Sequence, residues 1–364
     1  MNKIKEIKEA LNKKYYEREN EVEGLLIGML SKQHVLFIGE AGTGKSQLSS
    51  ELGKIVNGSN YFQWLLSQFS TPEELFGVLS LKELEQGVYK RNTSGKLPES
   101  HFAFLDEIFK ANSAILNSLL TIINERLFYN NGSPVKSPLM SIVGSSNEYP
   151  EEGEGLEALF DRFLLRYEVD YVKEEKSFVS LLKGENEVEV PEITLQELEQ
   201  YQEDVTKIRI PDQIINTLAE LRQALKDEGV RPSDRRFVQS LNLLKAKAFI
   251  EDRTEVVLKD VALLKNSLWV NPEQKDTVED LVYEFSIDQN ELKFDTRRKE
   301  AEELLSMLQD KERKVDEQLE VVNKLKTIVK DINDLQISDN KTKEQLVENI
   351  SNSINTFVNN IVEF

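Results

Sequence analysis

The amino-acid sequence predicts an α/β protein in which a parallel sheet flanked by helices is followed by an all-helical domain and a C-terminal helical hairpin. Short apolar runs alternate with helical patterns up to about residue 172, and beyond Val172 the strand patterns stop. Residues 297–335 contain neither Gly nor Pro. We therefore expect three domains, over residues 1–172, 173–275 and 276–364.

The first domain carries the strand signals. Two helices are expected in residues 1–33, where apolar residues recur at helical spacing, and 34–38 is a continuous apolar run, typical of a parallel strand buried on both faces. Further strands are expected over 61–66, 102–105 and 140–143, helices over 47–56 and 113–126, and a hairpin over 128–140 around Asn131 and Gly132.

The second and third domains show helical patterns throughout. In the second, helices are predicted over 174–183, 194–205, 211–228, 233–251 and 258–268, with a loop over 183–192 between the first two. In the third, apolar residues at near-heptad spacing predict one long helix over 297–335, interrupted by Glu312 and Lys326. A break at 338–340 precedes a second helix over 346–361, which would fold back as a coiled-coil-like hairpin arm.

Composition excludes several classes of site. The chain has no cysteine and only two histidines, His34 and His101, so disulfides, thiolate metal sites and multi-histidine metal sites are ruled out. No segment approaches the roughly 20 apolar residues of a membrane helix, and we expect a cytoplasmic protein without membrane insertion. A net charge of −19 opposes broad attraction to nucleic acid and favours protein partners.

A glycine-rich segment follows the first strand. It matches the pattern G-x-x-x-x-G-K-[ST] between a buried strand and a helix, and reads Gly39-Glu40-Ala41-Gly42-Thr43-Gly44-Lys45-Ser46, with Gln47 next. Such a loop curls its backbone N–H groups around a phosphate cluster at a helix N-terminus. Lys45 would reach the β- and γ-phosphates, and the Ser46 hydroxyl would hold Mg²⁺. The alternative is an accidental glycine-rich turn.

Polar residues also end two later strands. Asp106 and Glu107 follow an apolar strand, where Asp106 would orient Mg²⁺ and Glu107 would polarise the attacking water. Asn147 ends the run 141–147 and could hydrogen-bond the water or the γ-phosphate. The alternatives are a solvated acidic turn and a turn-forming Asn.

The order of these motifs resembles the AAA+ superfamily and, within it, the MoxR family. The segments 34–39, 71–77, 146–148 and 233–237 look most like its RavA branch, and the likeness covers about residues 15–275. The resemblance implies ATP rather than GTP, a homo-hexameric ring, a helical lid domain, and protein partners, among them von Willebrand factor A domain proteins. RavA-type proteins also carry a small β-rich domain near the C-terminus, and nothing in 296–364 matches it.

The resemblance also implies two arginine roles, with two candidate residues for each. An arginine from the neighbouring subunit touches the γ-phosphate in this family, and Arg162 is the first choice, with Arg166 one helical turn on as the second. The alternative for either is an intramolecular salt bridge among Glu157, Asp161 and Arg166. The lid arginine that senses nucleotide maps to Arg235, with Arg236 as fallback; the segment could instead be a structural helix cap provided by Ser233 or Asp234.

Three functions are compatible with these observations. The first is a MoxR-type ATPase that remodels or assembles partner proteins. The second is a nucleic-acid translocase or restriction-type motor, which would need basic residues in the ring channel, such as Lys136 or Lys90 and Arg91. The third is a nucleotide-gated scaffold whose C-terminal arm recruits partners while hydrolysis acts as a timer.

Overall fold

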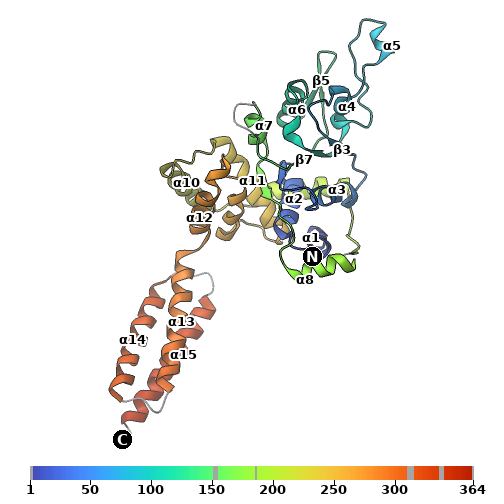
Figure 1. The fold of residues 1–364 in the computed structure, drawn as a ribbon. Coiled ribbons are helices and arrows are strands. Elements are labelled where there is room, and N and C mark those ends of the chain that lie inside the picture. The colour runs from blue at the N-terminus through green and yellow to red at the C-terminus, as the bar shows by residue number, and fades with distance from the viewer. Residues whose placement is uncertain (1–2, 151–154, 185–186, 310–314, 336–339, 363–364) are drawn as a thin grey trace. The chain divides into compact units, whose positions relative to one another are not determined.

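The computed structural model describes residues 3–150, 155–184, 187–309, 315–335 and 340–362 (Figure 1). The chain divides into two compact units, residues 1–283 and 284–364. The domain boundaries expected at residues 172 and 275 stay predictions. None of the helices in the described residues is long and apolar enough to cross a membrane.

A five-stranded parallel sheet forms the centre of the first unit. Its order is β3-β4-β7-β1-β8, and its strands are β1 (Val35–Ile38), β3 (Tyr61–Leu65), β4 (Phe102–Asp106), β7 (Ser141–Ser146) and β8 (Leu165–Glu168). Because all the strands are parallel, their carboxyl ends share one edge of the sheet. The predicted fold class is confirmed, and β8 is the one strand of these five that the sequence did not predict.

Helices surround this sheet, and two small sheets lie beside it. The helices up to residue 183 are α1 (Lys3–Lys14), α2 (Glu19–Ser31), α3 (Lys45–Ile55), α4 (Pro72–Phe76), α5 (Leu81–Leu84), α6 (Ser113–Glu125), α7 (Glu157–Arg162) and α8 (Glu175–Lys183). The hairpin expected around Asn131 consists of β5 (Leu127–Asn130) and β6 (Ser133–Lys136), and β2 (Val56–Asn57) pairs with β9 (Ile193–Thr194).

Apart from β9, which the sequence did not predict, the rest of the first unit is helical, as expected. It contains α9 (Leu195–Lys207), α10 (Asp212–Asp227) and α11 (Asp234–Ile250), and the helix predicted over 258–268 is a 3-10 helix, Leu258–Asn266. α12 (Lys275–Ser286) runs across the division between the two units. One apolar core joins α1, α2, β1 and α3 to α9 and α11, so the sheet and the helical segment are packed together.

The second unit is made of helices that pack on one another. They are α13 (Gln289–Gln309), α14 (Val315–Asp334) and α15 (Asn340–Val362), around a core that includes Ala301, Leu325, Ile332 and Ile350. The long helix expected over 297–335 is therefore two helices, α13 and α14. The charged run 310–314 separates them in the sequence and, like most of the break expected at 338–340, lies outside the described residues.

Candidate functional site

The glycine-rich loop joins β1 to α3, as the sequence predicts. Gly42 and Gly44 have φ values of 85° and 88°, which side-chain-bearing residues rarely adopt, and a Cβ added at either would meet no atom within 4 Å. The loop opens on a cavity of about 350 Å³. The cavity is lined by Ala41, Gly42, Thr43, Gly44, Lys45, Ser46, Gln47, Asp106, Glu107 and Asn147.

Lys45 is buried at the base of this cavity. Its Nζ donates to the carbonyl oxygen of Gly39, to that of Glu40 over 2.7 Å, and to Asn147 Oδ1 over 3.4 Å. Burial lowers the pKa of Lys45 below its ordinary value, and the carboxylates of Asp106 and Glu107 oppose that shift. The ammonium thus lies beside both acids, where it is placed to contact an anion.

Asp106 is held by the neighbouring strand. Its Oδ1 accepts hydrogen bonds from the Ser145 hydroxyl and, over 3.1 Å, from the backbone N–H of Glu107. Ser145 is fully buried in β7, and the sequence reasoning did not identify it. The available signal was a pair of serines, Ser145 and Ser146, at the end of a strand that is buried throughout.

Glu107 has an unusual backbone conformation directly after β4. Its φ of 53° is in the left-handed region, a conformation that costs roughly 1–3 kcal/mol in a non-glycine residue and is typical of functional sites. Asn147 Nδ2 donates to Glu107 Oε1 over 2.6 Å, and Lys110 Nζ lies 3.2 Å from Oε2. The carboxylate is therefore held between Asn147 and Lys110.

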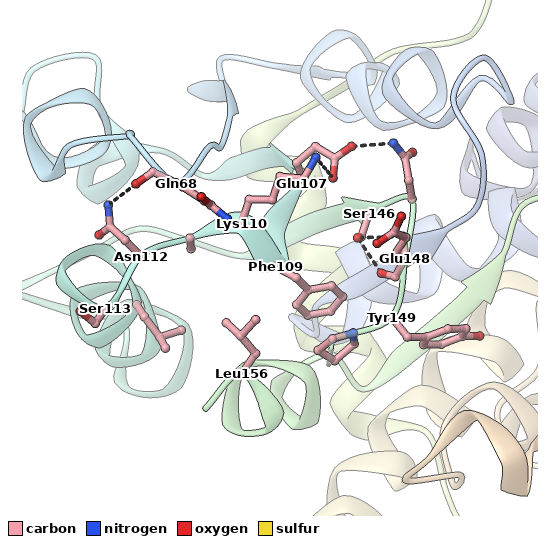
Figure 2. Close-up of a pocket in the computed structure, with 14 residues that line it drawn as sticks. Gln68, Glu107, Phe109, Lys110, Asn112, Ser113, Ser146, Glu148, Tyr149 and Leu156 are labelled. Carbon is pink, nitrogen blue, oxygen red and sulfur yellow. Dashed lines mark hydrogen bonds and ion pairs between the residues drawn. The ribbon is translucent and has the colours of Figure 1, made fainter. Parts of the chain in front are cut away.

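Figure 2 shows a second cavity, of about 540 Å³. Glu107 and Asn147 line both this cavity and the first. Lys110, Phe109 and Tyr149 are among its other lining residues. Glu107 consequently borders both the cavity of the glycine-rich loop and this neighbouring space.

The residues around the loop fit a magnesium nucleotide. Ser46 and Asp106 line the same cavity, which offers a hydroxyl and a carboxylate oxygen to a hard divalent cation. Within the described ranges no cluster of three or more His, Cys, Asp or Glu could hold a metal by itself. Such a donor set is typical of Mg²⁺, which keeps water and phosphate oxygens as its other ligands.

The predicted arginines do not line the cavity of the loop. Arg162 is the last residue of α7 and Arg235 the second residue of α11, and both contact Asp161 Oδ2, at 3.2 Å and 3.3 Å. Ser233 caps α11 by accepting from the N–H of Arg236, so the expected cap is present. Arg235 therefore lies in the capped first turn of α11 and contacts Asp161, the residue next to Arg162.

Arg166 is not one helical turn beyond Arg162, and that expectation is wrong. It lies in β8, where its guanidinium is buried against the rings of Phe160 and Trp269, 4.1 Å and 5.0 Å from their centroids. It donates to the carbonyl oxygens of Phe163, Phe160 and Trp269. Because these partners enclose Arg166 within its own chain, its position argues against a contact with a neighbouring subunit.

Two further residues that the sequence did not reveal support the glycine-rich loop from outside. The Tyr171 hydroxyl donates to the carbonyl oxygen of Ala41 over 3.0 Å and to Glu40 Oε2 over 3.1 Å. Arg18 donates to the carbonyl oxygen of Thr43 over 3.2 Å. No motif marks these residues, because their partners are distant in the sequence and are mostly backbone atoms.

Two family models match successive parts of this chain. The family model described as the MoxR domain in the MoxR-vWA-beta-propeller ternary systems matches residues 2–209, and a model of the AAA lid domain matches residues 213–282. An uncharacterised protein of Methanocaldococcus jannaschii is 38% identical over 307 residues, which cover 84% of this chain and 77% of that protein.

Two other matches are more distant. The chaperone MoxR1 of Mycobacterium tuberculosis is 29% identical over 161 residues, 43% of this chain and 41% of that protein. A crystal structure of a candidate ATPase from Cytophaga hutchinsonii has a TM-score of 0.65 at 19% identity, covers 79% of this chain and 94% of its own, and shares the fold. These matches do not favour a nucleic-acid translocase. The chain belongs to the MoxR family of AAA+ ATPases.

Proposed function

We propose that this protein hydrolyses ATP with the aid of Mg²⁺ in a hexameric ring and uses the cycle to remodel or assemble partner proteins. The observation that carries the proposal is the convergence of Lys45, Ser46, Asp106, Glu107 and Asn147 on one cavity below the glycine-rich loop. These residues come from three neighbouring strand ends of a parallel sheet, the usual location of ligand sites in such folds.

Each residue of the cavity has a role in this proposal. The backbone from Gly39 to Gly44 cradles the phosphates, and Lys45 neutralises the β- and γ-phosphate oxygens. Ser46 and Asp106 hold Mg²⁺, which supplies charge stabilisation for the transferring phosphoryl group. Glu107 accepts a hydrogen bond from the attacking water, and Asn147 holds both Glu107 and the water in position.

Two arginines complete the proposed site. Arg162 would reach the γ-phosphate of a nucleotide in the neighbouring subunit, since its guanidinium is absent from the cavity of its own chain. Arg235 would contact the nucleotide of its own subunit from the lid. Arg162 is preferred to Arg166 because 22% of its side chain is exposed, whereas Arg166 is 2% exposed.

The proposed partners are proteins. The matched family model describes systems that contain a von Willebrand factor A protein, and such a protein is the first partner we propose. The relative from Mycobacterium tuberculosis is a chaperone, which supports remodelling as the kind of work performed. A cytoplasmic location and membership of the RavA-like branch remain parts of this proposal.

The Glu107→Gln variant tests the proposed function. It removes the base while keeping the shape of the side chain, so it should bind ATP with Mg²⁺ as the wild type does and turn over at least about 100-fold more slowly. Glu125→Gln, at the exposed end of α6, is the matched control and should be fully active. Hydrolysis by Glu107→Gln at the wild-type rate would refute the catalytic assignment.

The same variant identifies the partner. With ATP bound and not hydrolysed, Glu107→Gln should retain a von Willebrand factor A protein in a pull-down that includes ATP and Mg²⁺. Lys45→Ala, which cannot bind nucleotide, is the control and should retain much less. Equal recovery by the two variants would contradict nucleotide-dependent capture.

A further inference from the structure

Three arginines meet on a single carboxylate, that of Asp161 at the end of α7. Arg162 Nη1 lies 3.2 Å and Arg235 Nη2 3.3 Å from Oδ2, while Arg236 Nη2 lies 2.9 Å from Oδ1. Arg236 also donates to the backbone carbonyl oxygen of Asp161 over 2.7 Å. Asp161 therefore connects the arginine proposed to act on the neighbour with two arginines of the lid helix α11.

The three guanidiniums differ in how firmly they are held. Arg236 is 2% exposed and is fixed further by the carbonyl oxygen of Ser267 at 2.7 Å. Arg235 is 49% exposed, and Arg162 is 22% exposed. Oδ1 of Asp161 is thus bound to a buried anchor, and Oδ2 is shared between two side chains that solvent can reach.

Asp161 holds the guanidinium of Arg162. Within the described part of the chain, Arg162 Nε is shielded from solvent and has no hydrogen-bond partner, so Asp161 Oδ2 is its ion-pair partner. A long, flexible guanidinium held by one carboxylate loses its preferred direction when that carboxylate loses its charge. The neighbouring residue thereby determines where Arg162 points.

We propose that Asp161 is a positioning residue. It orients Arg162 toward the neighbouring subunit and couples that orientation to the position of Arg235 on the lid helix α11. The proposal rests on the proposed function, in which Arg162 acts in trans and Arg235 contacts the nucleotide of its own subunit. When Arg235 turns to that nucleotide, Oδ2 is left to Arg162 alone. A subunit that has bound ATP then offers a more firmly held arginine to its neighbour.

Subunit mixing tests this proposal. Asp161→Asn keeps the size of the side chain and removes its charge, and it should lower ATPase turnover about 10- to 100-fold while ATP affinity stays unchanged. Glu107→Gln subunits cannot hydrolyse but still offer an intact Arg162, whereas Arg162→Ala subunits can hydrolyse but offer no arginine. Mixing these two should restore activity, which establishes the trans role independently.

Asp161→Asn should behave in mixtures as Arg162→Ala does. With Glu107→Gln subunits it should regain activity, because its own hydrolytic site is intact and the partner supplies the arginine. With Arg162→Ala subunits it should regain none, because neither subunit presents the arginine correctly. Recovery in that second mixture, or full activity of Asp161→Asn alone, would overturn the positioning role.

Two further variants separate positioning from folding. Asp260→Asn breaks the ion pair of a buried carboxylate with Arg253 elsewhere in the same helical region. It should lower stability, but its ATPase activity in the subunit mixtures should not follow the pattern expected for Asp161→Asn. Asp161→Glu keeps the charge and should present Arg162 better than Asp161→Asn does, so it tests the role if the Asn variant does not fold. Failure of the mixture of Glu107→Gln with Arg162→Ala would refute the trans arginine, and the positioning role with it.

Discussion

Asn147 joins the two most critical side chains of the cavity: its Nδ2 donates to Glu107 Oε1 over 2.6 Å, and its Oδ1 accepts from Lys45 Nζ over 3.4 Å. The amide has a donor and an acceptor at opposite ends, and here each faces the partner that suits it. Asn147 therefore keeps the acid and the ammonium at a fixed separation across the proposed γ-phosphate position.

Replacing Asn147 should damage catalysis more than binding. In Asn147→Ala the carboxylate of Glu107 loses one of its two partners and moves toward Lys110, so turnover should fall roughly 100-fold while the KM for ATP changes little. Steady-state ATPase kinetics measure both quantities. Asn117→Ala on α6 is the control, and an equal rise in KM and fall in turnover would contradict this role.

Ser145 should tune the magnesium requirement. Its hydroxyl donates to Asp106 Oδ1, so Ser145→Ala leaves that oxygen with one donor fewer and allows the carboxylate to rotate. Residues that orient a metal ligand typically contribute about 10- to 100-fold in metal affinity. We expect half-maximal ATPase activity at a correspondingly higher Mg²⁺ concentration.

The control for Ser145 is another buried serine. Ser240 is fully buried in α11 and bonds the carbonyl oxygen of Arg236, so Ser240→Ala should affect stability and leave the Mg²⁺ titration unchanged. An unaltered Mg²⁺ titration for Ser145→Ala would show that the hydrogen bond from Ser145 does not contribute to metal binding by Asp106.

His34 should make folding sensitive to acid. Burial, with the Arg126 guanidinium beside it, holds the pKa of His34 well below its ordinary value of about 6.5, and its Nδ1 accepts from the N–H of Ile142 over 2.9 Å. Below about pH 6.5 the unfolded chain binds a proton at this residue that the native protein does not. The free energy of unfolding therefore falls as pH falls, by up to about 1.4 kcal/mol per pH unit.

The His34→Asn variant isolates this contribution. Asn can still accept from Ile142 but does not titrate, so its stability, measured by urea denaturation, should vary less steeply between about pH 6.5 and 4.5 than that of the wild type. His101→Asn is the comparison variant: His101 Nδ1 also accepts a backbone N–H, from Asn60 over 2.9 Å, but the site is partly exposed. Burial lowers the pKa of His101 as well, though less than that of His34, so this variant should flatten the pH profile less than His34→Asn does. Parallel pH profiles for wild type and His34→Asn would contradict the prediction.

The sequence predicts the parts of this site that depend on local order. The glycine-rich loop, Asp106, Glu107 and Asn147 each follow an apolar run, and parallel strands bring such run ends to one edge of a sheet. Four of the five strands of that sheet follow from the same runs. The left-handed backbone of Glu107 could not be predicted, because glycine is the residue that normally marks this conformation.

The parts that the sequence does not predict depend on distant contacts. β8 reads Leu165-Arg166-Tyr167-Glu168, and alternation of this kind is typical of a half-exposed strand or a helix end. Part of what covers Arg166 there is Trp269, about 100 residues later, whose carbonyl oxygen accepts from it. The convergence of three arginines on Asp161 likewise requires α11 to pack against α7, which no local pattern indicates.

Arg166 should prove a structural residue whose planar shape matters more than its charge. Arg166→Lys keeps a positive charge but cannot pack a planar group against Phe160 and Trp269 or donate to the carbonyl oxygens of Phe163, Phe160 and Trp269 together. Leaving a charge buried with too few partners costs several kcal/mol, so we expect unfolding to become easier by about 2–4 kcal/mol in urea denaturation.

The role of Arg166 can be separated from a trans role by comparison with Arg162. Arg162→Lys, at a partly exposed position, should lose turnover with little loss of stability, whereas Arg166→Lys should lose stability first. At a temperature low enough for Arg166→Lys to stay folded, its subunits should still supply an arginine to neighbours that have an intact Glu107, because Arg162 is unchanged. Normal stability combined with failure to donate would place Arg166, and not Arg162, at the neighbour's phosphate.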